Sequence, residues 1–291
     1  MDNIKTFLKK QYTEETTSVY LREITNFLAN NPSAETYYYK DLISYLGILR
    51  KRYPNPKTLN RILAAIKVYY VFLCRQGTRK DNPAKNIHLK DKISRDIQLQ
   101  DLFSIEELET LLTSKIERFN DLNTRNKVLI SLLIYQALKP AEIENLELED
   151  INLEQATIYI KATPKTNSRT LSLKANQILV FKSYIDETRI KFSLFSTENK
   201  TAFLLSNSGQ AMQSEDITKH IKRHYGKLFA PRNLNCLTIR QSVITNLLKQ
   251  NHDLRLVQVF AGHKTPSTTE KYKQADLEAL KTAIKQYHPM K

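Results

Sequence analysis

The sequence predicts a mainly α-helical protein of two domains, with one small antiparallel sheet in the second domain. At 291 residues the chain is long enough for two domains of ordinary size, each with its own core. Apolar residues recur at helical spacing along most of it, whereas strand-like stretches occur only in the second half. Residues 78–101 are polar, rich in lysine and without clear periodicity, which is typical of a linker. We therefore expect domains at 1–95 and 96–291.

The first domain is expected to be a bundle of four helices. They are separated by breaks rich in proline and asparagine, and their ranges are 2–11, 15–29, 39–52 and 57–76. The last helix carries a stripe of apolar residues at helical spacing, namely Leu59, Ile62, Ile66, Tyr69, Tyr70 and Leu73. Lys57, Arg61 and Lys67 fall on its other faces, where they are candidates for contact with a polyanion.

The second domain is expected to be mostly helical, with the sheet at its edge. Ser104 and Glu107 have the spacing of a capping box, which predicts that a helix begins there. The apolar run at 128–138 is too short to span a bilayer and predicts a buried core helix. Three short stretches are candidate strands, namely 156–161, 169–173 and 202–206.

The charge balance indicates a polyanionic partner. Lysine and arginine number 45 against 30 aspartates and glutamates, a formal net charge of +15, and each phosphate that such a surface neutralises releases counterions. A generically soluble basic protein is the alternative. The chain has neither GxGxxG nor GxxxxGK followed by serine or threonine, so we do not expect an ATP-driven reaction. Two cysteines without a CxxC, and a start without the apolar core of a signal peptide, favour a reducing cytoplasm.

Residues 237–274 carry the side chains of phosphoryl-transfer chemistry. The pattern predicts two helices, a tight turn at Gly262 and a short third helix, with Arg240 at the head of the first, His263 after the second and Tyr272 in the third. A tyrosine hydroxyl is a poor nucleophile until cations favour its phenolate, and a reacting phosphate needs donors aimed at its oxygens. The structural alternatives are that Tyr272 is a packing or a surface residue, and that His263 caps a helix by binding its last carbonyls.

This stretch resembles the active-site region of the tyrosine recombinases, the phage-integrase and Xer-like site-specific recombinases. Their pattern has an arginine before a helix, then a Gly-His pair, then a tyrosine nine residues after the histidine, and here 272 − 263 = 9. The resemblance covers nearly the whole chain. "TLNRILAAIKVYYVFLCRQGTRKDNPA" is similar to the last helix of the family's DNA-clamping domain, "ALKPAEIENLELEDINLEQATIYIK" to the segment with its first catalytic arginine, and "KTNSRTLSL" to the β-hairpin with its catalytic lysine. It implies a SAM-like DNA-binding bundle followed by a catalytic domain.

The resemblance also implies a recombinase that cleaves and rejoins DNA through a 3′-phosphotyrosyl intermediate, without a cofactor or a metal. Tyr272 would be the nucleophile, Arg240 would grip the scissile phosphate, His263 would donate to it, and Lys165 would protonate the departing 5′ oxygen. Integration, excision, inversion and dimer resolution would all use this chemistry. Double-stranded DNA is the expected partner, and a terminal helix over 276–288 would link protomers into a homo-tetramer.

Two positions depart from the family's pattern. Lys139 stands where the family has its first catalytic arginine, and Leu237 stands where a histidine precedes the second arginine by three residues. Lysine keeps the charge but loses the planar bidentate grip on phosphate, and leucine donates nothing. A catalytically impaired DNA-binding protein of the same fold is therefore the chief alternative, and a metal-dependent nuclease is a weaker third.

The stretch "KHIKRHYGK" offers further candidate contacts. Lys219 and Arg223 are expected on a basic helix face toward the DNA backbone. His220 and His224 are four residues apart and would fit two ligands of a metal, but no further ligand is apparent in the sequence.

Overall fold

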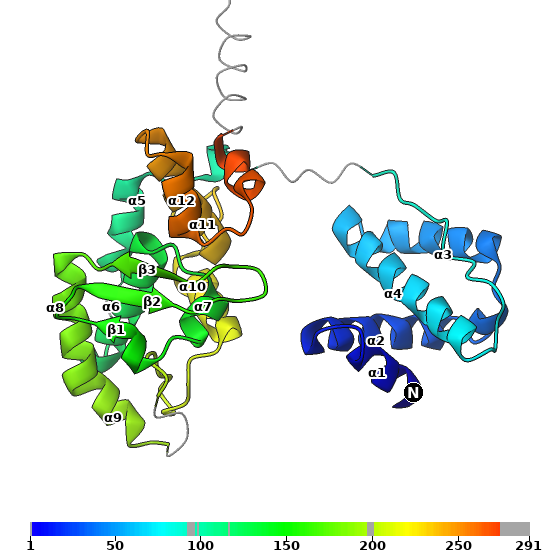
Figure 1. Cartoon of the computed structure of the whole chain (residues 1–291), viewed down its shortest axis with the longest axis horizontal. Helices are drawn as coiled ribbons and strands as arrows, with labels where there is room; N and C mark the ends of the chain where they lie inside the picture. Colours follow the sequence, from blue (N-terminus) through cyan, green and yellow to red (C-terminus); the bar gives the residue numbers. More distant parts are fainter. Residues whose placement is uncertain (1, 92–96, 98, 116, 197–200, 274–291) are drawn as a thin grey trace, which may run out of the picture. The chain divides into compact units, whose positions relative to one another are not determined.

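In the computed structural model of the chain, residues 2–91, 97, 99–115, 117–196 and 201–273 are described. The chain divides into two compact units, Met1–Arg95 and Asp96–Lys291, and each has its own hydrophobic core. The described part is mainly α-helical with one three-stranded antiparallel sheet, as the sequence predicts (Figure 1).

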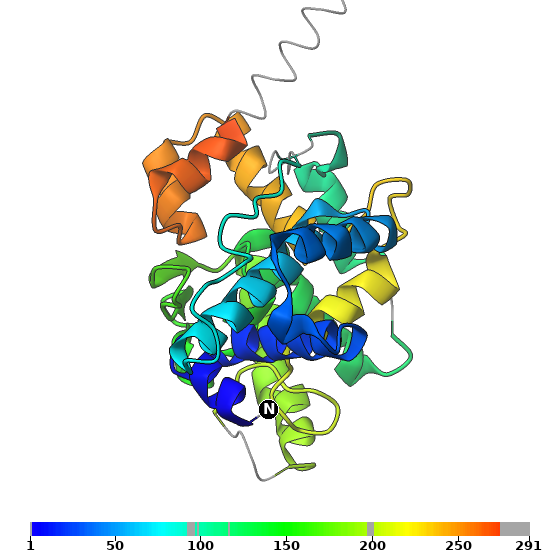
Figure 2. The same cartoon turned by 90° about the vertical axis from the view of Figure 1, so that its right-hand side faces the viewer.

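The described residues of the first unit form four α-helices (Figures 1 and 2). Their apolar side chains form one core. The helices are α1 (Asp2–Lys9), α2 (Glu14–Asn30), α3 (Tyr39–Arg52) and α4 (Pro56–Arg75), which agrees with the predicted ranges apart from small differences at the ends. The Asn55 side chain caps α4 by accepting a hydrogen bond from the Lys57 N–H at 2.9 Å. The whole apolar stripe of α4 is buried, whereas Lys57 and Arg61 are exposed and Lys67 is half-buried.

The second unit contains the remaining described helices and a larger core. The helices are α5 (Ile105–Glu109), α6 (Asn120–Tyr135), α7 (Pro140–Glu144), α8 (Ala175–Ser183), α9 (Arg189–Ser193), α10 (Ser214–Tyr225), α11 (Cys236–Lys249) and α12 (Leu254–Ala261). Residues 266–273 are also helical, and the expected helix over 276–288 lies outside the described residues. The described chain also has 3₁₀ turns at Ala34–Thr36, Leu99–Asp101, Thr110–Leu112 and Leu148–Asp150 and a π-helical turn at Tyr184–Thr188.

Two predictions for the helices of this unit are confirmed. The Ser104 hydroxyl accepts a hydrogen bond from the Glu107 N–H at 3.2 Å, and the Glu107 carboxylate accepts one from the Ser104 N–H at 2.9 Å, so the capping box starts α5. α6 is the predicted core helix, since every residue from Val128 to Ile134 is buried. No helix in the described ranges is long and apolar enough to cross a membrane.

The sheet is made of β1 (Ile151–Asn152), β2 (Thr157–Ile160) and β3 (Arg169–Ser172) in that order, all antiparallel. β2 and β3 lie within two of the three predicted stretches, and Ile160 pairs with Arg169 at the end nearest the hairpin turn. The prediction of a strand at 202–206 is wrong, because this segment forms only isolated bridges, with Glu147 and with Ala211. Its apolar residues are buried, but its two bridge partners, Glu147 and Ala211, lie outside the named strands. No neighbouring strand in the described residues therefore extends the pairing. Ile151–Asn152 supplies the third strand instead.

Candidate active site

A single cavity of about 900 Å³ in the second unit is lined by all five residues that the sequence predicts to be catalytic. They come from four separate segments: the start of α7, the β2–β3 hairpin, α11, and the chain that follows α12. In chain order they are Lys139, Lys165, Arg240, His263 and Tyr272. The fold therefore brings together residues that are more than a hundred positions apart in the sequence.

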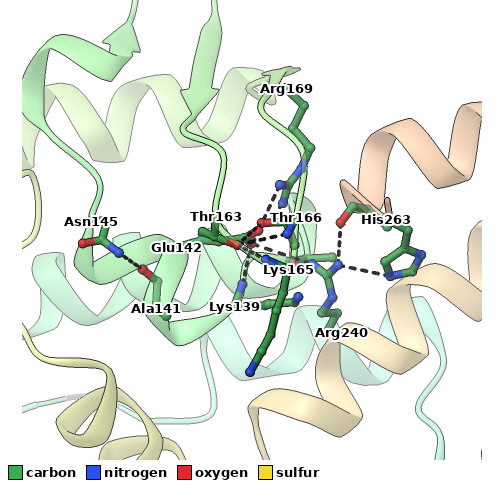
Figure 3. A network of polar contacts seen from close by, with 12 residues as sticks. Lys139, Ala141, Glu142, Asn145, Thr163, Lys165, Thr166, Arg169, Arg240 and His263 are labelled. Carbon is green, nitrogen blue, oxygen red and sulfur yellow. Dashed lines mark hydrogen bonds and ion pairs between the residues drawn. The ribbon is translucent and has the colours of Figure 1, made fainter. Parts of the chain in front are cut away.

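Arg240 lines this cavity, and two backbone carbonyls hold its side chain. Its guanidinium donates to the carbonyl oxygens of Ala137 and Ala261, both at 2.5 Å, and its side chain is buried (Figure 3). Burial lowers the pKa of Arg240, an effect that Glu142 opposes and the nearby Arg169 reinforces. Because two of its donors are already fixed by the backbone, the guanidinium needs little reorganisation to meet an anion.

His263 follows a helix stop that only glycine fits well. Gly262 ends α12 in the left-handed region at φ 66°, and its N–H donates to the carbonyl of Val259 at 2.9 Å. The imidazole of His263 lies 3.4 Å (Nε2) from Arg240 Nη2 and 2.8 Å (Nδ1) from the Thr269 hydroxyl. The ring therefore contacts Arg240 and Thr269. The last carbonyl of α12, that of Ala261, accepts a hydrogen bond from Arg240 rather than from His263, so His263 does not act as the helix cap.

The polar neighbours of His263 define its protonation state. Arginine can only donate hydrogen bonds, so Nε2 accepts and Nδ1–H donates to Thr269 in the neutral ring. Burial, followed by the charges of Arg240 and Lys139, lowers the pKa of His263 to about 4. The imidazole is consequently neutral near pH 7 in the protein without DNA.

Tyr272 packs beside this histidine. The two rings are nearly parallel, with an interplanar angle of 18° and centroids 5.9 Å apart. Tyr272 is buried, and burial raises the pKa of its hydroxyl. The charge of Arg240 opposes this effect without outweighing it, so the pKa is raised overall. Arg240 is thus the group that favours the phenolate in this environment.

The structure distinguishes between the two lysines of the hairpin region. Lys161 forms ion pairs with Glu147 and with Asp150, the latter at 3.6 Å, and does not line the cavity. Lys165 is exposed and lines it. The hairpin that carries Lys165 is attached to the histidine segment, because the N–H of Asn167 donates to the carbonyl of Gly262 at 3.0 Å.

Lys139 precedes α7, and its backbone N–H donates to the Glu142 carboxylate at 2.9 Å. The side chain is half-buried. Burial lowers the pKa of Lys139, and the positive charges of Arg240, Arg169 and Lys165 lower it further, against the opposing carboxylate of Glu142. The ammonium group is therefore less strongly basic than that of an ordinary surface lysine.

Sequence reasoning missed a buried ion pair behind the cavity. Arg169, at the start of β3, donates two hydrogen bonds of 3.0 Å to the carboxylate of Glu142 in α7, and both side chains are almost fully buried (Figure 3). Glu142 also lies 3.8 Å from Arg240. A carboxylate three residues after Lys139 was visible in the sequence, but nothing local indicated its partner in β3.

Leu237 is the other departure from the family's pattern, and it also lines the cavity. It lies in the first turn of α11 and is 62% exposed. An exposed leucine at this place offers no hydrogen bond to a phosphate.

The candidate DNA contacts lie on two helices of different units. In α4, Arg61 forms a 3.0 Å ion pair with the buried Glu23. In α10, Lys219 lines the cavity, and both Lys219 and Arg223 line a second hollow of about 620 Å³.

The histidine pair of α10 shows no sign of a metal site. The rings of His220 and His224 are 4.5 Å apart, but the Lys115 ammonium contacts Nδ1 of His224. Within the described residues, no group of three or more histidine, cysteine, aspartate or glutamate side chains is placed to hold a metal ion.

A helical bundle followed by a mostly helical unit, with arginine, histidine and tyrosine around one cavity, defines the class of the tyrosine-type DNA recombinases. The sequence profile of the phage integrase family matches residues 102–278, and that of the phage integrase N-terminal SAM-like domain matches residues 5–77. The chain therefore belongs to the phage integrase family, whose activity is site-specific recombination.

Individual relatives agree with this assignment. The chain is 24% identical over 300 residues to the tyrosine recombinase XerC of Alcanivorax borkumensis, covering 99% of this chain and 94% of the relative. It is 29% identical over 246 residues to the tyrosine recombinase XerD of Staphylococcus saprophyticus, covering 84% and 80%.

Solved structures share the fold. The XerH site-specific recombinase bound to a palindromic difH substrate in a post-cleavage complex gives a TM-score of 0.68 at 21% identity, covering 92% of this chain and 78% of that one. A lambda integrase dimer bound to a COC′ core site gives a TM-score of 0.67 at 12% identity, covering 93% of both chains.

Proposed function

We propose that this recombinase cleaves and rejoins duplex DNA through a 3′-phosphotyrosyl bond to Tyr272, as one protomer of a homo-tetramer on DNA. The unit 1–95 acts as the DNA-binding domain and the unit 96–291 as the catalytic domain. The observation that carries the proposal is the meeting of Arg240, His263 and Tyr272 in one cavity, with the guanidinium already fixed by two carbonyls.

The charges around the cavity support a phosphodiester as its substrate. Among the residues that line the cavity, five are basic, namely Lys139, Lys165, Lys219, Arg240 and Lys264, and one is acidic, Glu215. Lys139 and Arg240 also interact with Arg169 and with the carboxylate of Glu142. A phosphate in the cavity offsets this excess of positive charge. Arg240 grips its non-bridging oxygens, and the same charge favours the phenolate of Tyr272 for attack.

The chemistry requires no external energy. Attack by the Tyr272 oxygen on phosphorus forms the tyrosyl ester as the bond to the 5′ oxygen breaks, so one phosphodiester replaces another. Attack by a 5′ hydroxyl on that ester reverses the step. The leaving oxygen also needs a proton. Lys139 and Lys165, the two lysines discussed above that line the cavity, are the candidate proton donors.

Other features fit the same proposal. The related structures of XerH and lambda integrase contain their DNA sites. The formal charge of +15 favours a polyanion. A cytoplasmic location, where Cys74 and Cys236 remain free thiols, is part of the same proposal.

A second candidate is a DNA-binding protein of the same fold that has lost cleavage. The exposed Leu237 favours it, because this position in the cavity has no donor. Removal of one transition-state donor typically costs about 10² to 10³ in rate. A slow enzyme and an inactive one are therefore both compatible with leucine here, and only a direct assay separates them.

The test is to trap the covalent intermediate. A preferred duplex is first selected from a randomised library, and a nick beside the candidate scissile phosphate lets the leaving fragment diffuse away. The native chain is expected to give a protein–DNA adduct that survives denaturing electrophoresis and forms in the presence of a chelator. Tyr272→Phe should give no adduct, whereas Tyr159→Phe, an exposed tyrosine of β2, should give as much as the native chain.

Two results would contradict the proposal. Tight, salt-dependent binding without any adduct would favour the DNA-binding protein. Cleavage that a chelator abolishes, and that Tyr272→Phe does not change, would indicate a metal-dependent nuclease.

A further inference from the structure

The two lysines of the cavity lie in different surroundings. Lys165 is exposed on the hairpin, whereas Lys139 is half-buried at the start of α7. Four charged groups act on Lys139, namely Arg240 from α11, Glu142 from α7, Arg169 from β3 and Lys165 from the hairpin. Two of these neighbours are buried guanidinium groups. Glu215 and Lys219 of α10 and Lys264 also line the cavity.

The reaction needs a group that both gives and accepts a proton. During cleavage the departing 5′ oxygen takes a proton, and during rejoining the incoming 5′ hydroxyl loses one. A group that serves both directions at one pH works best when its pKa lies near that pH. An arginine cannot serve, because its guanidinium keeps its proton in proteins, whereas a lysine beside other cations gives its proton up more readily.

We propose that Lys139 is the proton-transfer residue of this recombinase, and that the lysine at the family's arginine position is a second acid–base group in the cavity rather than a weaker grip on phosphate. The inference rests on the proposed function. It assigns proton transfer to Lys139 instead of Lys165, the residue expected from the sequence. Lys165 then contributes only its positive charge near the phosphate.

Cleavage and rejoining each exchange one phosphodiester bond for another and transfer one proton at the 5′ oxygen. In cleavage the bond between the Tyr272 oxygen and phosphorus forms and the bond between phosphorus and the 5′ oxygen breaks. The electron pair of the broken bond stays on the 5′ oxygen, which takes a proton from the Lys139 ammonium, while the tyrosyl proton passes to water. In rejoining, the neutral Lys139 amine takes the proton of the attacking 5′ hydroxyl as the bond between the 5′ oxygen and phosphorus forms. The bond between phosphorus and the Tyr272 oxygen breaks, and the departing phenolate takes a proton from water.

The fold keeps Lys139 in place for this role. Its backbone N–H is bound by Glu142, and Glu142 is bound by Arg169 through two hydrogen bonds. Pro140 follows it and fixes the backbone at the first position of α7. The lowered pKa of Lys139, caused by burial and then by Arg240, agrees with an ammonium that can release its proton.

The experiment replaces the leaving oxygen by sulfur. The selected duplex is made with a 5′-bridging phosphorothiolate at the scissile position, and the rate of adduct formation is compared with that on the ordinary duplex. A thiol ionises near pH 8.5, about seven units below water, so a thiolate leaves without a proton donor. The measured quantity is the ratio of the sulfur rate to the oxygen rate for each variant.

Lys139→Arg is the decisive variant, because arginine keeps the charge and removes the transferable proton. General acid catalysis contributes about 10² to 10⁴ in rate. We expect Lys139→Arg and Lys139→Gln to lose at least about 10² on the oxygen duplex and to recover most of that loss on the sulfur duplex. Lys264→Ala removes an exposed lysine that lines the same cavity, and its ratio should equal that of the native chain.

The outcomes separate the alternatives. A raised ratio for Lys139→Arg together with an unchanged ratio for Lys165→Ala supports the assignment of proton transfer to Lys139. Raised ratios for both variants would show that the two lysines share proton transfer, which contradicts the proposal. An unchanged ratio for Lys139→Arg overturns it, and if the ratio of Lys165→Ala rises instead, the proton comes from the hairpin. Lack of an adduct from the native chain on both duplexes contradicts the proposed function itself, before any lysine is compared.

Misfolding cannot imitate the expected result. A variant that has lost its structure is slow on both duplexes, so its ratio does not rise. Thermal unfolding and DNA binding measured on Lys139→Arg and Lys139→Gln show how much of each preparation is intact.

Discussion

The Arg169 guanidinium binds the Glu142 carboxylate through two hydrogen bonds of 3.0 Å, and the two side chains are each 1% exposed. Burial raises the pKa of Glu142, but the hydrogen bonds and charge of Arg169 outweigh this effect, and the pKa is lowered overall. The same carboxylate binds the backbone N–H of Lys139 and lies near Arg240. The Glu142 carboxylate therefore connects Arg169 of β3, Lys139 before α7 and Arg240 of α11.

Glu142→Gln should destabilise the protein strongly. Removal of one partner from a buried ion pair typically costs about 3–5 kcal/mol, because the remaining charge has no counterion. We expect a loss of this size in the free energy of unfolding, measured by urea denaturation. The control is Asp186→Asn, which breaks the exposed pair with Lys182 and should cost less than about 1 kcal/mol.

A double variant separates stability from positioning. Glu142→Leu with Arg169→Met replaces the pair by apolar groups, which is often neutral or stabilising. We expect the double variant to recover most of the stability that Glu142→Gln loses and still to form the adduct slowly, since the Lys139 N–H and Arg240 lose their carboxylate. Normal cleavage by a stable double variant would show that the pair serves only stability.

Gly262→Ala should impair both stability and cleavage. At φ 66° an alanine costs about 1–2 kcal/mol, and its Cβ would lie 2.6 Å from Arg169 Nη1, so that guanidinium must move. Gly77→Ala is a matched control, because Gly77 has φ 78° and nothing within 4 Å of the added Cβ. Thermal unfolding should show a loss in both variants, but only Gly262→Ala should slow adduct formation. Equal cleavage by the two would contradict the role given to Arg169.

Thr269→Val should release the His263 ring. The Thr269 hydroxyl is the partner of Nδ1 at 2.8 Å, and its loss leaves a buried donor without a partner, at a cost of about 1–3 kcal/mol. We expect adduct formation to slow by about tenfold, in line with an energy of this size, and Thr269→Ser to restore it. Nitrogen chemical shifts of His263 should show a change in tautomer for the valine variant.

The control for this prediction is Thr245→Val. Thr245 is as buried as Thr269, but its hydroxyl has no hydrogen-bond partner among the described residues. Loss of that hydroxyl should leave stability and cleavage nearly unchanged. A valine variant at 269 that keeps both the native tautomer and the native rate would exclude a positioning role.

Stability should fall on acidification because of His263. Its pKa is about 4 in the folded protein and about 6.5 when unfolded, so the unfolded chain binds the extra proton. This contribution is fully present above pH 6.5 and is lost as the pH falls toward 4, and its size is of order 3 kcal/mol. His220, whose pKa burial also lowers to about 4, acts in the same window. Urea denaturation from pH 7 to 4 should show a smaller decline for His263→Gln and for His220→Gln than for the native chain.

DNA binding by the first unit should depend on salt through α4. Each lysine or arginine that contacts a phosphate adds about 0.9 to the slope of log K against log salt. We expect Lys57→Ala and Arg61→Ala each to lower this slope by about one, with affinity reduced similarly for all sequences. An unchanged slope for both variants would place the DNA on another face of the bundle.

Much of the fold was predictable because its signals are local. The four helices of the first unit follow from apolar spacing and from caps such as Asn55, and the Ser104–Glu107 box fixed the start of α5 before any tertiary contact was known. The segment 202–206 was mispredicted as a strand for the opposite reason. Pairing depends on what lies beside a segment, and its neighbours are loops.

The sequence by itself determined the residue types of the candidate site, the nine-residue interval from His263 to Tyr272 and the two departures at Lys139 and Leu237. Only the tertiary structure decided that Lys165 rather than Lys161 lines the cavity, that Glu142 pairs with Arg169, and that Lys139 is half-buried among cations. The physical reason is that burial and electrostatic environment depend on groups brought together from distant segments, and these distances are not encoded in any local pattern.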